Sequence, residues 1–211
     1  MAERTRACTH CHGPQGLAGP DGYYPRLAGK PANYLYGQLL HFRDGRRHYP
    51  LMRGLLEPLS DAYLMEMAVY FSRLELPYPP ASRSLDGGAT WTRGRDLVLR
   101  GDPQREIAAC ASCHGERLTG ALPGVPGLLG LPRDYITAQL GAWKSGMRRA
   151  HEPDCMADVA RRLSAADVNA IAHWLSSQPV PQGGPNPVSS VATRACGRPP
   201  VPATDAKAPL T

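Results

Sequence analysis

The sequence carries one five-residue pattern twice, as CTHCH at residues 8–12 and as CASCH at residues 110–114. In each copy two cysteines are separated by two residues, and a histidine follows the second cysteine directly. Two thiols at this spacing lie about one helical turn apart, so both can bond to one edge of a single flat group. The histidine ring then projects toward the centre of that group. The pattern therefore predicts two sites of the same kind.

This pattern is the attachment signature of c-type haem. The thiols add across the two vinyl groups on one haem edge, and the imidazole binds the iron as its proximal ligand. We therefore predict two covalently bound haem c cofactors. The residues predicted to hold them are Cys8, Cys11, His12, Cys110, Cys113 and His114.

Three other interpretations of a Cys-x-x-Cys pair fit less well. Two pairs that share one zinc ion usually lie about 15–20 residues apart, whereas each pair here has its own part of the chain. A thioredoxin-like redox motif requires a βαβ context, and no strands are expected. A structural disulfide within the pair requires no histidine beside it. Haem is therefore the preferred interpretation.

A longer repeat surrounds the two motifs. Residues 25–47 align without gaps with residues 126–148, and residues 52–71 align with residues 156–175. The chain is therefore predicted to be a duplicated domain. Its parts are a first domain over 1–76, a linker over 77–90, a second domain over 91–179 and an extended Pro-rich tail over 180–211.

Each copy is predicted to be all-α, with no credible strand alternation. Trp91 to Ala111 is expected to form a helix that leads into CASCH, with an interruption near Gly101–Pro103. Ser164 begins an S-x-x-D pattern that predicts a helix start. Apolar residues recur at helix spacing over 33–43, 60–74, 135–145 and 164–175.

A haem that only carries electrons needs a second axial ligand, and methionine serves with histidine in cytochromes c. Met52 and Met156 occupy the same position of the two repeats. A single methionine usually packs in a core, but two at matched positions behind two haem motifs predict iron ligands. The methionines expected to be terminal, core or surface residues are Met1, Met65, Met67 and Met147.

Cys155 stands directly before Met156, and three roles stay open for it. Its thiolate could replace Met156 on the iron, it could be a packed thiol, or it could pair with Cys196 in the tail. Export to an oxidising compartment favours the disulfide, which would attach the tail to the second domain.

Other residues are candidates to orient the haem groups. The carbonyls of Pro25 and Pro126 are expected to accept the Nδ1–H of the two motif histidines and to fix their orientation. His48 and His151 are candidate titratable neighbours of the haem edge. Candidate donors to the haem propionates, with plain helix packing as the alternative, are Tyr34, Gln38, Arg47, Tyr135, Gln139 and Arg148.

The 211 residues carry a formal net charge of +6. A basic surface favours acidic partners, but the arginines are scattered and no basic helix is interleaved with aromatics, which argues against nucleic acid. No apolar run approaches the roughly eighteen residues that can span a bilayer. The N-terminus lacks the apolar centre of a signal peptide, so an exported protein would have had its signal removed or replaced.

The two halves resemble those of a dihaem cytochrome c of the cytochrome c4 type, a duplication of the class I cytochrome c domain. The resemblance spans about residues 8–177 and rests on both attachment motifs, both P-x-L-x-G segments, both Y-x-x-x-Q-L helices and both axial methionine positions. It implies an all-α pair of tandem class I cytochrome c domains related by a pseudo-twofold, with haem edges facing across the interface. It also implies a periplasmic location, often against the inner membrane.

The resemblance implies electron transfer without enzymatic activity. The expected redox partners are a dehydrogenase or a quinol-oxidising complex such as cytochrome bc1, and a terminal oxidase. One alternative is a haem-bearing subunit of a membrane dehydrogenase or oxidase complex. Another is an enzyme, such as the dihaem thiosulfate dehydrogenases with a thiolate on one iron, or a peroxidase with one open iron. Cys155 is the residue that supports this second alternative.

Overall fold

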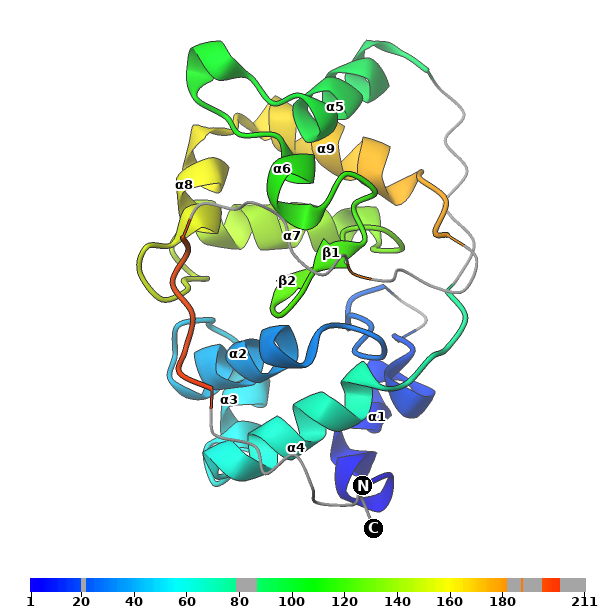
Figure 1. Ribbon diagram of the computed structural model, residues 1–211, viewed down its shortest axis with the longest axis vertical. Helices are drawn as coiled ribbons and strands as arrows, with labels where there is room; N and C mark the ends of the chain where they lie inside the picture. The colour runs from blue at the N-terminus through cyan, green and yellow to red at the C-terminus, as the bar shows by residue number, and fades with distance from the viewer. Residues whose placement is uncertain (20–21, 79–86, 182–186, 188–194, 202–211) are drawn as a thin grey trace.

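The computed structural model describes residues 1–19, 22–78, 87–181, 187 and 195–201. Within them the protein consists of two small helical bundles stacked on each other (Figure 1). The bundle of the first half contains α1 (Arg6–His12), α2 (Ala32–Arg43), α3 (Pro50–Leu56) and α4 (Asp61–Ser72). The bundle of the second half contains α5 (Ala89–Leu99), α6 (Cys110–His114), α7 (Arg133–Lys144), α8 (Cys155–Arg162) and α9 (Ala165–Ser176). Short 3₁₀ turns lie at Glu3–Thr5, Pro14–Gly16 and Pro103–Arg105.

The all-α prediction is confirmed, with one small addition. Residues Gly120–Ala121 (β1) and Val125–Pro126 (β2) form an antiparallel pair, in which Gly120 lies opposite Pro126. Strands of two residues are too short to show apolar–polar alternation, so the pattern could not reveal them. The predicted domain boundaries stay predictions, and much of the linker and of the tail lies outside the described residues.

Each half has its own apolar core. In the second half α5 packs on α9, and the cluster includes Leu97, Ile171 and Leu175. The two helices approach closely because Gly94 of α5 has no side chain, and a Cβ there would collide with the carbonyl oxygen of Ala170. No helix in the described ranges combines the length and apolar character needed to cross a membrane.

In the first half α2 packs on α4, and the centre of the core contains Leu35, Tyr36, Leu64 and Phe71. The first core is made mainly by α2 and α4, whereas the second also contains α5.

The predicted interruption near Gly101–Pro103 is confirmed. Helix α5 ends at Leu99, Gly101 has a φ of +73°, and a bridge between Asp102 and Ile107 follows. A left-handed φ suits glycine, and Pro103 begins the 3₁₀ turn. As a result α6 is a separate five-residue helix that consists of the whole CASCH motif.

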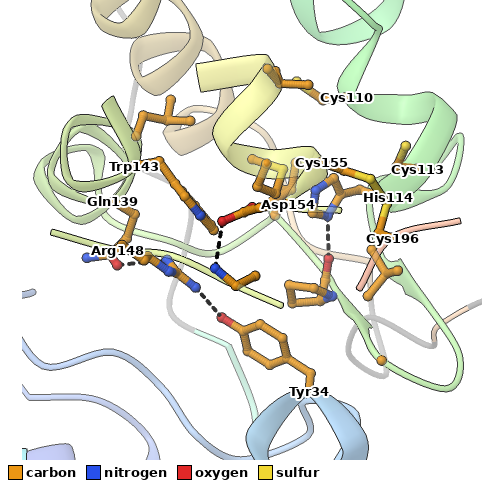
Figure 2. A pocket seen from close by; sticks show the side chains of 18 of the residues that line it. Tyr34, Cys110, Cys113, His114, Gln139, Trp143, Arg148, Asp154, Cys155 and Cys196 are labelled. Carbon is orange, nitrogen blue, oxygen red and sulfur yellow. Dashed lines mark hydrogen bonds between the residues drawn. A yellow bond between two sulfur atoms is a disulfide. The ribbon is translucent and has the colours of Figure 1, made fainter. Parts of the chain in front are cut away.

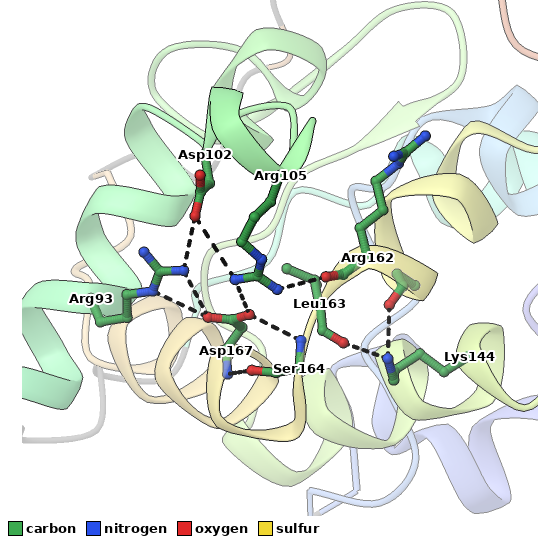
Figure 3. Close-up of polar contacts among 9 residues, drawn as sticks. Arg93, Asp102, Arg105, Lys144, Arg162, Leu163, Ser164 and Asp167 are labelled. Carbon is green, nitrogen blue, oxygen red and sulfur yellow. Dashed lines mark hydrogen bonds and ion pairs between the residues drawn. The ribbon is translucent and has the colours of Figure 1, made fainter.

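A capping box begins α9, as the S-x-x-D pattern predicts. The Ser164 side chain accepts from the Asp167 N–H, and the Asp167 carboxylate accepts from the Ser164 N–H. Arg93 and Arg105 donate to the same carboxylate from α5 and from the following 3₁₀ turn (Figure 3). This cluster ties the start of α9 to the segment that leads into α6.

Two candidate cofactor cavities

The first predicted site lies in a cavity of the first half. Cys8, Cys11 and His12 enter it from α1, and Met52 enters it from α3. The cavity has a volume of about 690 Å³, which lies in the usual range of roughly 300–1,000 Å³ for cofactor sites. Its walls are mostly apolar and come mainly from α2, α3 and α4, with a contribution from α7 of the other half. The structure thus brings together all four residues predicted for this site.

The second predicted site lies in an equivalent cavity. Cys110, Cys113 and His114 enter it from α6 (Figure 2). Met156 enters it from α8. Its volume is about 290 Å³. The structure again gathers the four predicted residues in one cavity. Iron ligation by the two histidines and the two methionines stays a prediction.

Both motif histidines are held by a proline carbonyl, as predicted. The Nδ1–H of His12 donates to Pro25 at 2.8 Å, and that of His114 donates to Pro126 at 2.7 Å. Because a carbonyl oxygen only accepts, Nδ1 carries the proton, and Nε2 keeps a lone pair for a metal. Burial lowers the pKa of both imidazoles, which favours the neutral, metal-binding form.

The four motif cysteines form no disulfide with one another. Burial raises the pKa of Cys8, and it raises the pKa of Cys110 to about 12. Metal-binding thiolates need a lowered pKa, so these thiols suit thioether bonds in apolar surroundings better than a zinc site. In the described part of the chain no three His, Cys, Asp or Glu side chains are placed to hold a metal ion. The zinc and internal-disulfide alternatives therefore lose their support.

Cys155 pairs with Cys196, with the two Cα atoms 5.7 Å apart. Of the three roles left open for Cys155, the structure therefore selects the disulfide. A bonded sulfur is not available as a thiolate ligand, so Met156 is the sulfur of this segment that remains for the iron.

The residues predicted to face the haem propionates meet where the two halves touch. Arg47 donates to Gln38 in its own half at 3.0 Å and to Gln139 in the other half at 2.6 Å. Arg148 mirrors it, donating to Gln139 and to Gln38 at 2.8 Å each. Each arginine also donates to a tyrosine hydroxyl of the opposite half, at 3.3 Å and 3.4 Å. This interface network consists of Tyr34, Gln38, Arg47, Tyr135, Gln139 and Arg148.

The backbone beside the interface network follows the same symmetry. Arg47 and Arg148 form an antiparallel bridge. On one side of it the His48 N–H donates to the Met147 carbonyl at 2.7 Å, and an equivalent 2.7 Å bond lies on the other side. The two halves are thus joined by matched segments of the repeat.

The interface network carries more positive charge than the described residues neutralise. Arg148 is only 4% exposed, Arg47 and Lys30 lie near it, and no carboxylate of the described residues forms an ion pair with either arginine. Burial lowers the pKa of Arg148, and the charge of Arg47 lowers it further. Burial would raise the pKa of Tyr34, but the surrounding cations lower it. Buried cations need anions beside them, and haem propionates would supply them.

Two buried polar atoms in the wall of the second cavity have no hydrogen-bond partner among the described residues. They are Nε2 of His41 and Nε1 of Trp143. Because buried polar groups are nearly always satisfied, these atoms fit a polar edge of a bound group. The observation supports haem, whose propionates are such an edge.

The two histidines proposed for the haem edge behave differently. His48 lines the first cavity, as expected. His151 lines neither cavity and instead stacks on His41, with the ring centroids 5.3 Å apart. Because His41 lines the second cavity, the place of His151 near that haem edge stays a prediction. Burial lowers the pKa of His41 to about 4, so this pair is neutral at pH 7.

Sequence reasoning missed His41 and Lys30 as parts of the cavity walls. In the repeat alignment His41 is matched by Ala142, and Lys30 is matched by Leu131. A comparison of the two repeats picks out residues that occur in both copies, so it misses residues that occur in one copy. His41 is buried and Lys30 is half-buried near the contact between the halves, which only the folded structure shows.

Comparisons with known proteins agree with this geometry. Residues 104–179 match the family model for cytochrome c. A protein named thiosulfate dehydrogenase electron acceptor, from Thiomonas intermedia, is 41% identical over 174 residues, which cover 82% of this chain and 79% of that protein.

Two solved structures share the two-bundle arrangement. Reduced cytochrome c4 from Pseudomonas stutzeri matches with a TM-score of 0.72 and 30% identity, over 83% of this chain and 95% of that one. A thiosulfate dehydrogenase from Marichromatium purpuratum matches with a TM-score of 0.71 and 35% identity, over 82% of this chain. The match covers only 36% of that longer chain.

Proposed function

Since this chain belongs to the cytochrome c4 family and carries two covalently attached haem c groups, we propose that it accepts electrons from a thiosulfate dehydrogenase in the periplasm and passes them toward a terminal oxidase. The observation that carries the choice of donor is the 41% identity with a thiosulfate dehydrogenase electron acceptor. The identity with cytochrome c4 is lower, at 30%. Electron transfer is the function of the family, and the donor and acceptor are the proposal.

The motif residues of each half would hold one haem. In the first half Cys8 and Cys11 would bond the haem covalently, and His12 and Met52 would be the ligands of its iron. When bound, each haem supplies a one-electron iron couple whose potential depends on the axial ligands and on burial. The equivalent residues of the second half are Cys110, Cys113, His114 and Met156.

The interface network lies between the two sites. All of its residues except Arg47 line both cavities, so a single layer of side chains separates them. The arginines bond to glutamines of both halves and thereby fix the halves in one arrangement. Such a fixed, short separation suits electron transfer from one site to the other within the protein.

We assign no catalytic role to either haem. An iron that took both the histidine and the methionine of its half as ligands would have no open position for a substrate. The enzyme alternative requires a thiolate or an open site, and Cys155 is held in a disulfide. These observations support a carrier rather than an enzyme.

The periplasm fits the covalent chemistry of the chain. A disulfide such as Cys155–Cys196 forms and persists in oxidising compartments. The net charge of +6 favours acidic redox partners and a peripheral position at an anionic inner-membrane surface. Both associations belong to the proposal.

A rapid-mixing experiment tests the electron donor. Oxidised holoprotein is mixed, without oxygen, with a small amount of thiosulfate dehydrogenase and an excess of thiosulfate, and haem reduction is followed by absorbance. We expect both haems to be reduced, at a rate that changes with ionic strength because charges steer the encounter. The matched control omits the dehydrogenase, and no comparable reduction is expected there.

Two outcomes would refute the proposal in different ways. If thiosulfate and its dehydrogenase leave the protein oxidised, the donor is wrong. If thiosulfate alone reduces the protein and is oxidised in repeated turnovers with an added acceptor, the chain is itself an enzyme.

A second candidate is an electron-transfer subunit in a stable complex with the dehydrogenase. It is favoured by the match to a part of the longer thiosulfate dehydrogenase chain. Size-exclusion chromatography of the native periplasmic extract separates the two candidates. A stable complex predicts elution of the haem signal together with the dehydrogenase, whereas a free carrier elutes at the size of one 22.8 kDa chain with its two haems.

A further inference from the structure

Residues 195–201, here called the cover segment, form part of the wall of the second haem cavity. Cys196, Gly197 and Pro199 line this cavity together with His114 and Met156. Figure 2 shows Cys196 bonded to Cys155 at the edge of the pocket. The tail of the chain thus contributes directly to the second site.

Two links attach the cover segment to the start of α8. The disulfide joins Cys196 to Cys155, the first residue of α8, which directly precedes Met156. The Gly197 N–H donates to the Pro153 carbonyl at 3.0 Å. Both links lie within three residues of the predicted iron ligand.

The cover segment fits tightly at one end and reaches the other half at its far end. A Cβ at Gly197 would collide with the backbone carbonyl oxygens of His151 and Glu152. Pro199 packs against α2 of the first half, where a Cβ at Gly37 would lie 3.4 Å from its Cγ. The segment therefore spans from the loop before α8 to the first half.

The loop that the cover segment holds is itself braced. Asp154 is 5% exposed, and its carboxylate accepts from the Ala150 N–H at 2.6 Å and from the Ala157 N–H at 3.0 Å. The first bond closes the loop before α8, and the second caps the helix. If the cover segment moves, the loop and the first turn of α8, where Met156 lies, should therefore move with it.

The first cavity is built differently. Every described residue that lines it lies between Arg4 and Arg148, so the cover segment takes no part in it. On the helix that carries Met52, Leu51 and Leu55 are 66% and 50% exposed. The cover segment therefore closes the second site and not the first.

We propose that the cover segment is a positioning element of the second haem site: the Cys155–Cys196 disulfide and Gly197 close this cavity and hold Met156 against the iron. Solvent access and the axial ligand both set the properties of a haem iron. Loss of the cover therefore affects the second haem and leaves the first unchanged. The inference rests on the proposed dihaem carrier and on Met156 as a ligand.

The disulfide-free variant Cys155→Ser/Cys196→Ser tests this role. Both cysteines are replaced so that no freed thiol can bind the iron. In the oxidised holoprotein we expect the charge-transfer band of methionine-bound haem to fall by up to half. In the reduced protein we expect carbon monoxide to bind one of the two haems, and the midpoint potential of one haem to decrease. The first haem serves as the internal reference.

Gly197→Ala tests the same role with the disulfide intact, because the added methyl group displaces the segment. Its matched control is Gly141→Ala in α7, where a Cβ meets nothing within 4 Å. We expect Gly197→Ala to repeat the loss at one haem and Gly141→Ala to match the parent protein. Haem content by mass and the unchanged band of the first haem verify that each variant is folded.

If the disulfide-free variant keeps both bands, both potentials and two irons closed to carbon monoxide, the inference is overturned. That variant decides the matter even if Gly197→Ala does not fold. A parent protein without a second methionine band would refute Met156 as ligand, which is a separate failure of the proposed site. Failure of the dehydrogenase to reduce the protein would refute the proposed donor and leave this test unaffected.

Discussion

Arg47 and Arg148 face each other across the contact between the two halves, and each donates to both Gln38 and Gln139. Two guanidinium groups at such close range repel each other. Their arrangement is held by shared neutral acceptors and, in the holoprotein, is suited to the propionates of two haems. The same contact therefore joins the halves and lies between the two redox sites.

Replacing Arg148 by leucine should weaken both roles of this contact. A hydrogen bond to a charged group contributes about 1.5–3 kcal/mol, and Arg148→Leu leaves the glutamine oxygens with fewer donors. We expect the free energy of unfolding to fall by about 2 kcal/mol or more, measured by denaturant titration. Redox titration should show lower potentials, because a positive charge near the haems favours the reduced iron.

The control for this variant is Arg100→Leu. Arg100 is 76% exposed and forms a surface ion pair with Asp96, and such pairs contribute about 0–1 kcal/mol. Equal effects of the two substitutions on stability and potential would contradict a special role for the interface network.

Met52→Ala and Met156→Ala should each remove the axial sulfur of one haem only. We expect one midpoint potential to fall in each variant, because methionine ligation raises the potential. The exposed iron should bind carbon monoxide when reduced, which absorbance spectra detect. Met65→Leu is the control, since Met65 is buried in the first core and the change preserves volume. Irons that stay closed to carbon monoxide in both alanine variants would remove these residues as ligands.

Asp167 should give the second half a defined acid sensitivity. Burial alone would raise its pKa, but hydrogen bonds from Ser164, Arg105 and Arg93 lower the pKa to about 2. The pKa of an unfolded aspartate is about 3.9, so the unfolded chain takes up the proton first. The stabilisation is therefore complete above about pH 5 and is lost as the pH falls toward about 2.

Asp167→Asn tests this linkage. A difference of almost two pKa units corresponds to about 2.5 kcal/mol, so the variant should be less stable by about this amount at pH 7. Its free energy of unfolding, measured by urea titration at several pH values, should fall less steeply between about pH 5 and 2. The control is Glu106→Gln, which alters an exposed ion pair with Arg162. An unchanged pH slope in Asp167→Asn would contradict the assignment.

Gly94→Ala should separate α5 from α9. The added methyl group meets the backbone of Ala170 and the Cβ of Trp174, which cannot move aside as a flexible side chain does. Overpacking of this kind costs about 1–3 kcal/mol. Differential scanning calorimetry should show a lower midpoint for the second half, whereas Gly141→Ala on exposed helix surface should be neutral or stabilising.

Much of the fold was predictable because the same sequence pattern occurs in both halves of the chain, so each predicted helix is supported twice. The helices predicted over 33–43 and 135–145 appear as α2 and α7. The carbonyl partners of the motif histidines were predictable for a chemical reason, since a metal-binding imidazole needs its second nitrogen oriented. These features depend on local spacing, which the sequence contains directly.

Contacts between the halves were not predictable in the same way. Arg47 was expected at a haem propionate, and its bond to Gln139 depends on how two folded bundles dock. His151 was placed at a haem edge by its position before the methionine, and the stacking of its ring on His41 depends on the same docking. The path of residues 195–201 follows from the disulfide and from the space beside Gly197, which sequence periodicity does not encode.

The central claim is that each half closes its own iron with a histidine and a methionine. Near-infrared magnetic circular dichroism of the oxidised holoprotein tests it most directly, because the band positions identify the axial ligands of every low-spin haem present. The account predicts histidine–methionine bands whose intensity accounts for two haems per chain. A thiolate or bis-histidine band, or a high-spin signal from either haem, would contradict it.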